Sequence, residues 1–375
     1  MDRMSNISPF IVMDIVREAS KREDIIHFEV GQPDMPPSKN VISAFQKASF
    51  DNKFQYTDST GIVELKIKIS EFYKQKYNLN IASERIIITS GTSAAFLTTY
   101  SLLLNMGESI ALADPTYPCY KNFSHLLYIN PLMINVDKST NYQLTVGQIK
   151  KGIDAIKAVQ ISSPSNPTGS IYGKDSLKSL INFCITNGIY FISDEIYHGL
   201  VYDNEMEHSA LEFSDEAFVI NGFSKYFCMP GIRLGWVIVP EKFIRDAEKL
   251  IQNIYICPPT LSQYAALEAF DYEYLDKIRT EYQCRRDFLY SELSKLFNVD
   301  VKPKGAFYIW ADISRFSSDC YDFTMKLLDE AGVAVTPGID FGKNNTVNYI
   351  RFAYTRNIEH MKDGINRIKQ FLKNY

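Results

Sequence analysis

The chain is poor in the residues that build metal sites and disulfide frameworks. Its six cysteines and five histidines are scattered through 375 residues. The cysteines lack the close pairs of zinc sites and the density of a disulfide scaffold, and the histidines form no pair at ligand spacing. No Gly-x-Gly-x-x-Gly motif follows an expected strand. We therefore expect reduced, mostly structural cysteines and no metal, and the sequence disfavours metal catalysis and nicotinamide chemistry.

Long apolar runs and a strong excess of charge of one sign are also missing. No apolar stretch approaches the roughly 20 residues that span a bilayer, and Arg3, Asp14 and Arg17 interrupt the N-terminal region where a signal peptide would have its apolar core. The formal net charge is -4 and no long basic run occurs, which disfavours nucleic acid and anionic membranes as partners. The sequence predicts a cytoplasmic protein that binds a small molecule.

What the chain has in plenty is apolar residues arranged for an α/β fold. Hydrophobic residues make up 46% of the 375 positions, which is enough for two domains of unequal size. Short apolar runs alternate with helical patterns, as is typical of a sheet flanked by helices. The expected strands cover residues 86–89, 109–113, 132–136, 159–162, 190–193, 217–220 and 236–239.

The helix signals are clearest at the two ends of the chain and between the strands. Ser8 suits an N-cap and Pro9 the first helical position, so a short helix is expected to begin there. A long helical pattern begins near residue 261 and contains one break. Further helices are expected over residues 62–77, 96–104, 177–185 and 358–372.

Polar side chains that suit an anionic ligand follow one of these strands closely. Ser224 and Lys225 come just after the strand at 217–220, and Arg233 follows in the same glycine-rich loop. Open α/β sheets bind their ligands at such strand ends. A lysine, a hydroxyl and a fixed cation in one loop suit a ligand that is anionic and carries a carbonyl group. Pyridoxal phosphate has both features.

Three other polar segments also follow strands. Gly91-Thr92-Ser93 links a strand to a helix, where backbone amides and hydroxyls could hold a phosphate. Asn166 lies in an Asn-Pro-Thr-Gly segment, and Asp194 and Tyr197 follow the strand at 190–193. Each segment alone has an ordinary alternative as a turn, a helix cap or a packed tyrosine. Only their joint order and spacing are specific.

Together these segments resemble the fold-type I, class I/II pyridoxal-phosphate aminotransferases, from Gly31 to the final helix. The resemblance implies a large domain with a mixed, mostly parallel seven-stranded sheet flanked by helices, and a smaller α+β domain. It assigns residues 1–38 to an N-terminal arm and part of the small domain, 39–275 to the large cofactor-binding domain, and 276–375 to the small C-terminal domain. It also implies a homodimer with shared active sites.

By motif position, the resemblance assigns the chemistry to four residues. Lys225 would form a Schiff base, the internal aldimine, with pyridoxal 5'-phosphate and would then move the substrate's α-proton. Asp194 would pair with the ring nitrogen and keep it protonated, so that the ring accepts electrons. Asn166 and Tyr197 would donate hydrogen bonds to the phenolic oxygen of the ring and lower the pKa of the aldimine.

The resemblance also assigns the residues that hold cofactor and substrate. Tyr117 would stack on the ring, and Arg351 would bind the substrate α-carboxylate through two hydrogen bonds, with Asn166 and the Gly31 backbone nearby. The residues that would hold the phosphate are Gly91, Thr92, Ser93, Ser224, Arg233 and, from the other subunit, Tyr56. One position departs from the family pattern, because Gly222 stands where many members have Ser or Thr. One phosphate hydrogen bond is therefore expected to be missing or replaced.

The activity implied by the resemblance is ping-pong transfer of an amino group from an L-amino acid to a 2-oxo acid. The same scaffold also supports β-lyases, decarboxylases and cyclases, and a non-catalytic pyridoxal-phosphate regulator is a further alternative. The choice of substrate stays open. Apolar residues at 7–11 and near Tyr117 suit an apolar side chain, whereas a cation from the partner subunit would select a dicarboxylate.

Overall fold

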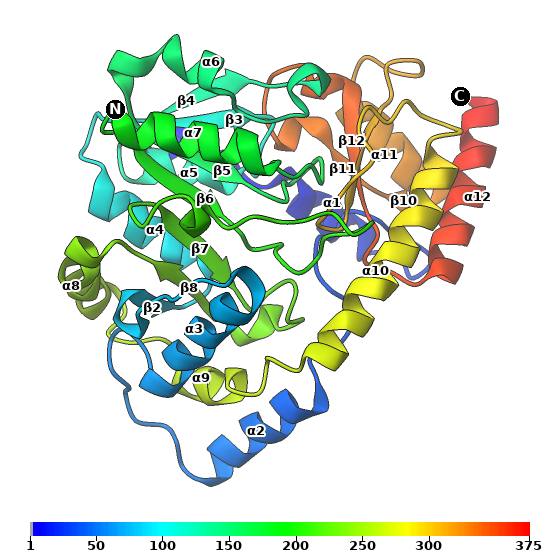
Figure 1. The fold of residues 1–375 in the computed structure, drawn as a ribbon. Coiled ribbons are helices and arrows are strands. Elements are labelled where there is room, and N and C mark those ends of the chain that lie inside the picture. The colour runs from blue at the N-terminus through cyan, green and yellow to red at the C-terminus, as the bar shows by residue number, and fades with distance from the viewer. Residues whose placement is uncertain (1–2) are drawn as a thin grey trace.

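The larger body of the molecule is built on a seven-stranded sheet (Figure 1). The computed structural model describes residues 3–375. The strand order is β2-β8-β7-β6-β5-β3-β4, and all neighbours are parallel except β8, which is antiparallel to both β2 and β7. The mixed, mostly parallel seven-stranded sheet that the family resemblance implies is confirmed. The bounds are β2 Ile86–Thr89, β3 Ser109–Asp114, β4 Asn130–Asn135, β5 Ile156–Ser162, β6 Tyr190–Asp194, β7 Phe218–Gly222 and β8 Gly235–Ile238.

Helices cover both faces of this sheet. Successive residues of a strand point to opposite faces. Ile88 belongs to the core cluster that also contains residues of α3 (Val63–Tyr77) and α7 (Lys174–Thr186), whereas its neighbour Ile87 belongs to the cluster of α4 (Thr92–Leu103) and α8 (Ile244–Ile254). Because both faces are buried, the strands are continuous apolar runs, which makes them recognisable in the sequence. The shorter helices of this body are α5 Cys119–Leu126 and α6 Val146–Lys150.

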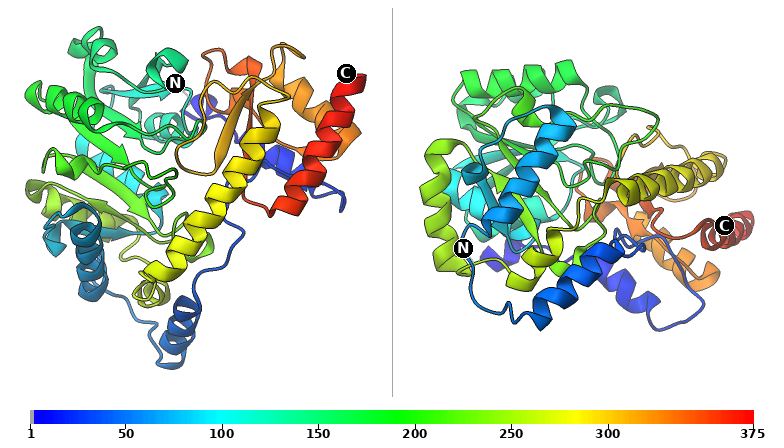
Figure 2. Two further views of the ribbon diagram at one scale, coloured as in Figure 1. Left: turned by 45° about the vertical axis from the view of Figure 1, so that its right-hand side comes forward. Right: turned by 60° about the horizontal axis from the view of Figure 1, so that its bottom comes forward.

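A second group of elements stands beside the sheet and joins the two ends of the chain (Figure 2). Its three-stranded antiparallel sheet has the order β11-β12-β9, and β1 near the N-terminus pairs in parallel with β10. Helices α10, α11 and α12 pack against these strands. The expected domain boundary after residue 275 falls inside α10, which is one continuous helix. The bounds are β1 Ile26–His27, β9 Tyr308–Asp312, β10 Val333–Ala334, β11 Thr336–Pro337, β12 Tyr349–Ala353, α10 Tyr272–Leu293, α11 Cys320–Ala331 and α12 Ile358–Asn374.

The N-terminal helix begins later than the sequence predicts. Helix α1 spans Ile11–Ala19, and its N-cap residue, Phe10, makes no side-chain cap. The carboxylate of Asp340 accepts the first two backbone N–H groups instead, with Oδ1 at 3.1 Å from Ile11 N and Oδ2 at 3.4 Å from Val12 N. The prediction of Ser8 as N-cap is therefore wrong, because a residue from the other end of the chain supplies the cap.

Helix α2 (Lys39–Phe50) projects from the rest of the molecule (Figures 1 and 2). It starts at Ser38, whose hydroxyl accepts the N–H of Val41 at 3.4 Å, and it packs against α9 (Thr260–Ala266). The long helical pattern from residue 261 thus divides into α9 and α10, as its break suggested. Among residues 3–375, no helix is both long and apolar enough to cross a bilayer.

Candidate functional site

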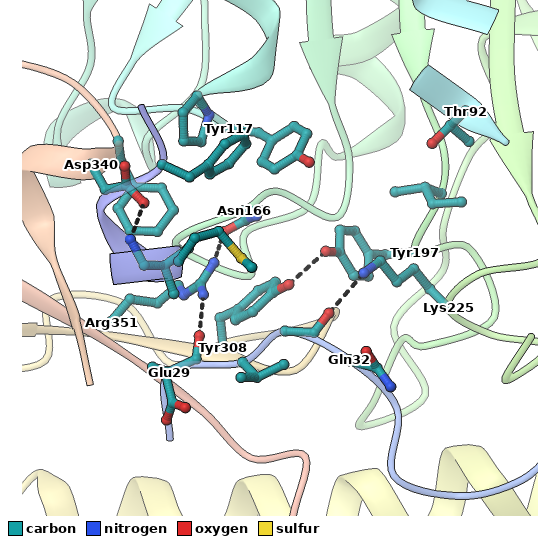
Figure 3. A pocket seen from close by; sticks show the side chains of 18 of the residues that line it. Glu29, Gln32, Thr92, Tyr117, Asn166, Tyr197, Lys225, Tyr308, Asp340 and Arg351 are labelled. Carbon is teal, nitrogen blue, oxygen red and sulfur yellow. Dashed lines mark hydrogen bonds between the residues drawn. The ribbon is translucent and has the colours of Figure 1, made fainter. Parts of the chain in front are cut away.

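A cavity of about 550 Å³ lies where the carboxyl ends of the large sheet's strands face α1 and the small sheet. Parallel strands deliver the loops that follow them to one edge, which brings segments distant in sequence together. Figure 3 shows how these side chains converge from both groups of elements. The residues expected from the sequence that line the cavity are Gly31, Thr92, Tyr117, Asn166, Asp194, Tyr197, Lys225 and Arg351.

Lys225 lies in the loop after β7, with its amine in the cavity. Its Nζ donates a hydrogen bond to the carbonyl oxygen of Gly31 at 2.7 Å and stands 5.7 Å from the ring centre of Phe307. Burial lowers the pKa of the Lys225 amine to about 8, and the positive charges of Arg351 and Arg233 add to this effect, while Asp194 opposes it. About a tenth of this amine is therefore neutral, and a nucleophile, at pH 7, far more than for an ordinary lysine.

Asp194 ends β6, and the residue is only 3% exposed. Its Oδ1 accepts the N–H of Ile196 at 3.0 Å, and its Oδ2 accepts the hydroxyl of Tyr120. Burial raises the pKa of Asp194 to about 6, although both hydrogen bonds lower it. Neutral donors thus fix this carboxylate at the cavity without supplying a charge to balance it.

Two tyrosines and one asparagine form a polar side of the cavity. The hydroxyls of Tyr197 and Tyr308 are 2.8 Å apart and hydrogen-bonded, and burial raises the pKa of Tyr197 well above its ordinary value. The amide oxygen of Asn166 accepts from Nη1 of Arg351 at 2.9 Å. A Cβ at Gly31 would lie 2.1 Å from the Tyr308 hydroxyl, so this close approach requires glycine.

Arg351 is a buried cation whose hydrogen-bond partners are all neutral. It projects from β12, is 5% exposed, and its guanidinium carbon lies 4.3 Å from the ring centre of Tyr308 and 4.8 Å from that of Phe341. Nη2 donates to the carbonyl oxygen of Glu29 at 2.8 Å. The buried Nε has no partner within the described chain. A buried guanidinium with a spare donor is suited to an incoming carboxylate.

The start of α4 and the loop after β7 meet beside the cavity. Gly91 has φ +79°, and a Cβ there would lie 2.5 Å from Nη2 of Arg233, so the guanidinium sits against the helix start. A Cβ at Gly222 would lie 3.0 Å from Cγ2 of Thr92 and from Cα of Gly235. The departure at Gly222 thus coincides with tight packing of the first turn of α4 against the strands. Ser224 is buried nearby, and Ser93 is exposed.

Tyr117 and Tyr56 have contrasting positions. Tyr117 lines the cavity, with its ring 6.1 Å from that of Phe10 and nearly perpendicular to that of Tyr120 at 5.4 Å. Tyr56 lies outside the cavity in a separate groove and is 76% exposed. Of the other expected residues, Gly91, Ser93, Ser224 and Arg233 do not line the cavity itself but lie in the two segments beside it, whereas Tyr56 lies in a different part of the described chain.

Sequence reasoning missed three residues that shape the site. Tyr120 orients Asp194, Tyr308 contacts Tyr197 and Arg351, and Asp340 caps the helix that forms one wall. The two tyrosines are among 24 in the chain and stand in no distinctive motif. Only the spatial pairing distinguishes them.

The chain matches a family model described as aminotransferase class I and II over residues 23–368. It is 40% identical to (5-formylfuran-3-yl)methyl phosphate transaminase of Methanocaldococcus jannaschii across 99% of this chain and 98% of that protein. It is 33% identical to valine–pyruvate aminotransferase of Mycobacterium tuberculosis across 98% of this chain and 97% of that protein. The crystal structure of an aminotransferase from Mycobacterium tuberculosis is similar with a TM-score of 0.97 at 33% identity, covering 100% of this chain and 99% of that one.

Proposed function

The chain belongs to the aminotransferase class I and II family, and from this membership we propose how its own residues divide the work of a pyridoxal-phosphate aminotransferase. It is an enzyme that transfers amino groups with the help of that cofactor. The relatives named above are all transaminases, which favours transamination over the lyase, decarboxylase, cyclase and regulator alternatives. Their substrates differ, and another relative is named aspartate aminotransferase, so the names alone select no substrate.

The fit to pyridoxal phosphate rests first on Asp194. A buried carboxylate with neutral hydrogen-bond partners is costly, and a protonated ring nitrogen would supply the missing positive charge. We assign Asp194 to that nitrogen, with Tyr120 and the Ile196 N–H orienting its two oxygens. When bound, the cofactor supplies a carbonyl carbon for covalent attachment and a ring that accepts electrons from the substrate α-carbon.

We assign covalent attachment and transfer of the substrate α-proton to Lys225. An ordinary lysine is an ammonium ion near pH 7 and can neither attack a carbonyl nor accept a proton. The lowered pKa of Lys225, about 8, makes its amine available for both. The Gly31 carbonyl directs the amine through its hydrogen bond of 2.7 Å.

The remaining groups of the cavity are assigned to binding. Arg351 would take the substrate α-carboxylate with its spare donor capacity, and Asn166, which is bonded to it, would hold its orientation. Tyr197 and Asn166 would donate to the phenolic oxygen, and Tyr117 would stack on the ring. The residues proposed to hold the phosphate are Gly91, Thr92, Ser93, Ser224 and Arg233, with Tyr56 contributed by a second subunit.

The observation that carries these assignments is the meeting of Lys225, Asp194 and Arg351 in one cavity. The test is borohydride treatment of the cofactor-loaded enzyme followed by peptide mass analysis. We expect the reduced cofactor to be found attached to Lys225, and this attached group is the label. We expect Lys225→Ala to lose both the label and the amino-acid-dependent change in visible absorbance. Lys242→Ala, at an exposed lysine, is the matched control and should keep both. A label on another lysine in the unaltered enzyme would refute the assignment.

A homodimer with shared sites is also proposed. Its support is a set of exposed large apolar side chains on α2, α3 and the segment between them, in a molecule whose Tyr56 lies away from its own cavity. Large exposed apolar patches mark interaction sites. The residues are Ile42, Phe50, Phe54, Tyr56, Val63 and Ile67.

The division into an N-terminal arm at 1–38, a large domain at 39–275 and a small domain at 276–375 is retained as a proposal. The parallel pairing of β1 with β10 supports the grouping of both chain ends, and residues 1 and 2 lie outside the described part. A cytoplasmic location is proposed as well. It is supported by the six cysteines, all of which are free.

A further inference from the structure

The charges that line the cavity are unevenly matched to the groups they must bind. Among the lining residues of the described chain, Lys225 and Arg351 are the only cations, whereas Glu29, Asp194 and Asp340 are acidic. The proposed function uses Lys225 for the chemistry and Arg351 for the substrate α-carboxylate. This chain therefore has no lining cation left to balance a second carboxylate on the substrate.

The wall beside Arg351 is apolar and comes largely from α1. The side chains that α1 and its N-cap residue present to the cavity are Phe10, Val12, Met13 and Val16. Tyr117 and Phe341 continue the same wall, and Phe341 also packs on the Arg351 guanidinium at 4.8 Å. A side chain that extends from an α-carbon held at Arg351 would meet this surface.

One broad apolar stripe on α1 explains how the helix can line a cavity and remain attached. At one edge of the stripe, Ile15 and Ala19 are buried with Ile25, Leu328 and Ala334 in a separate small core cluster. At the other edge, Val12 and Val16, one turn apart, line the cavity. The i, i+3, i+4, i+7 spacing of these four residues is that of an amphipathic helix, and here the stripe is shared between the core and the cavity.

Asp340 fixes this wall and adds a negative charge to it. Its carboxylate caps α1 through the N–H groups of Ile11 and Val12, at 3.1 and 3.4 Å. Figure 3 shows Asp340 at the same end of the cavity as Arg351 and Tyr117. Burial raises the pKa of Asp340, against the lowering effects of the two N–H groups and of the charges on Arg351 and Lys121. Asp340 thus positions the apolar helix face and opposes an anion beside it.

We propose that the preferred amino donor carries an uncharged, apolar side chain, aliphatic or aromatic, and that Asp340 is the positioning residue that sets this preference over dicarboxylates. The inference rests on the proposed function, because it takes Arg351 as the site of the α-carboxylate. A second carboxylate of aspartate or glutamate would lose water against an apolar wall without gaining a cation from this chain. Specificity then comes from a repulsive element as well as from the apolar contact.

The first test measures the half-reaction of the cofactor-loaded dimer with single amino acids by visible absorbance. We expect kcat/KM for leucine and phenylalanine to exceed that for aspartate and glutamate by at least about 100-fold. Equal or better reaction with either dicarboxylate overturns the inference and leaves the proposed function standing. An unchanged spectrum with every amino acid overturns the proposed function and the inference together.

The second test uses Asp340→Asn and Asp340→Ala. We expect the alanine variant to raise KM for phenylalanine about 10-fold with a much smaller change in kcat, because the wall loses its cap. The asparagine variant keeps an acceptor oxygen without the charge, so phenylalanine should largely recover while aspartate improves relative to it. L-Alanine as donor, whose side chain is too short to use the wall, should change little. An equal loss of kcat for all donors would mean that Asp340 is merely structural and would refute its assigned role.

A gain of specificity provides the third test. Val16→Lys introduces a cation into the wall, and we expect the ratio of aspartate to phenylalanine kcat/KM to rise at least about 10-fold. Ser20→Lys adds the same charge at an exposed position just beyond α1 and is the matched control. If both variants shift the ratio equally, the wall does not select the side chain and the inference fails.

Discussion

At the scale of single residues, the site depends on charged groups that are buried at a cost in free energy. Arg351 is buried among neutral partners, and Asp194 is buried with neutral donors. Neither has a charged hydrogen-bond partner, and the opposite charges of Lys225 for Asp194 and of Asp340 for Arg351 act on them only through space. This arrangement is typical of binding sites rather than of structural ion pairs, because ligand binding completes it.

The lowered pKa of Lys225 leads to a pH prediction. Covalent loading of the apoprotein with pyridoxal phosphate needs the neutral amine, whose fraction increases with pH. We expect the loading rate to rise with a midpoint near pH 8 and to level off above it, rather than near the ordinary lysine value of 10.5. The measurement is the growth of visible absorbance after mixing, across pH.

Arg351→Gln serves as the control for this profile. Removing that positive charge takes away one cause of the lowered pKa of Lys225, so the midpoint should move to higher pH. A midpoint that stays in the ordinary lysine range in the unaltered chain would contradict the prediction. Because this readout is cofactor loading, it is independent of whether Arg351 also binds substrate.

The motif residues could be identified from sequence because each follows a strand in a recognisable order. The residues that contact and orient them could not be identified in this way. Tyr120 and Tyr308 gain their roles from contacts with residues 74 and 111 positions away, at Asp194 and Tyr197 respectively. No local pattern encodes such a pairing, so it required the folded chain.

At the scale of elements, the turn that carries Asp194 and Tyr197 rests on a buried polar cluster beneath α3. The Tyr77 hydroxyl and His198 Nδ1 are 2.6 Å apart, and Glu195 Oε1 accepts the N–H of Ala210 at 2.8 Å. Burial raises the pKa of Glu195 to about 8 and lowers that of His198 to about 4. The turn is thus held by groups that favour their neutral forms.

This cluster predicts how stability changes with pH. The folded pKa of Glu195, about 8, lies above its ordinary value of 4.5, so its contribution is complete below pH 4.5 and is lost as pH rises through 8. The loss from one such group is at most about 1.4 kcal/mol per pH unit. Glu195→Gln keeps the acceptor oxygen and cannot ionise, so its free energy of unfolding should fall less from pH 5 to 8.

Urea unfolding across this pH range is the measurement, with Glu64→Gln at an exposed position of α3 as the control. His198 works in the opposite sense, since its lowered pKa removes stability as pH falls from 6.5 towards 4. Parallel pH curves for Glu195→Gln and the unaltered chain would contradict the prediction.

The start of α1 shows why helix boundaries are harder to predict than helices. The Ser-Pro pair at residues 8 and 9 is a sound local signal, yet the Ser8 hydroxyl lies 3.4 Å from the Asn122 amide oxygen. Asp340, 329 positions from Ile11, supplies the cap instead. Propensity predicted that a helix forms here, and tertiary contacts determined where it begins.

At the scale of the whole molecule, the exposed apolar residues around α2 predict assembly. Phe50 is 84% exposed, and Phe50→Lys should weaken the dimer because it would place a charge in the proposed interface. Met206→Lys, at a methionine that is 72% exposed on a loop, is the control. Sedimentation velocity at a series of concentrations measures the effect.

We expect the Phe50 variant to dissociate at concentrations where the control remains dimeric, and its activity to decline with dissociation if Tyr56 serves the neighbouring site. If the Phe50 variant dimerises with unchanged affinity, the interface does not include this part of α2. The strands of the sheet were predictable because buried strands are apolar throughout, whereas its mixed character was implied only by the resemblance to a known family. The surface through which subunits would associate was not predictable, because the sequence alone does not show whether a phenylalanine is exposed or buried.

The pairing of β1 with β10 joins His27 to Ala334. During synthesis, the N-terminal segment leaves the ribosome first but has no strand to join until almost all of the chain has followed. Helix α1 likewise cannot receive its cap until Asp340 has been synthesised. The large sheet can assemble meanwhile, because its neighbouring strands are closer in sequence. The wall that faces the substrate is therefore among the last parts of the enzyme to be completed.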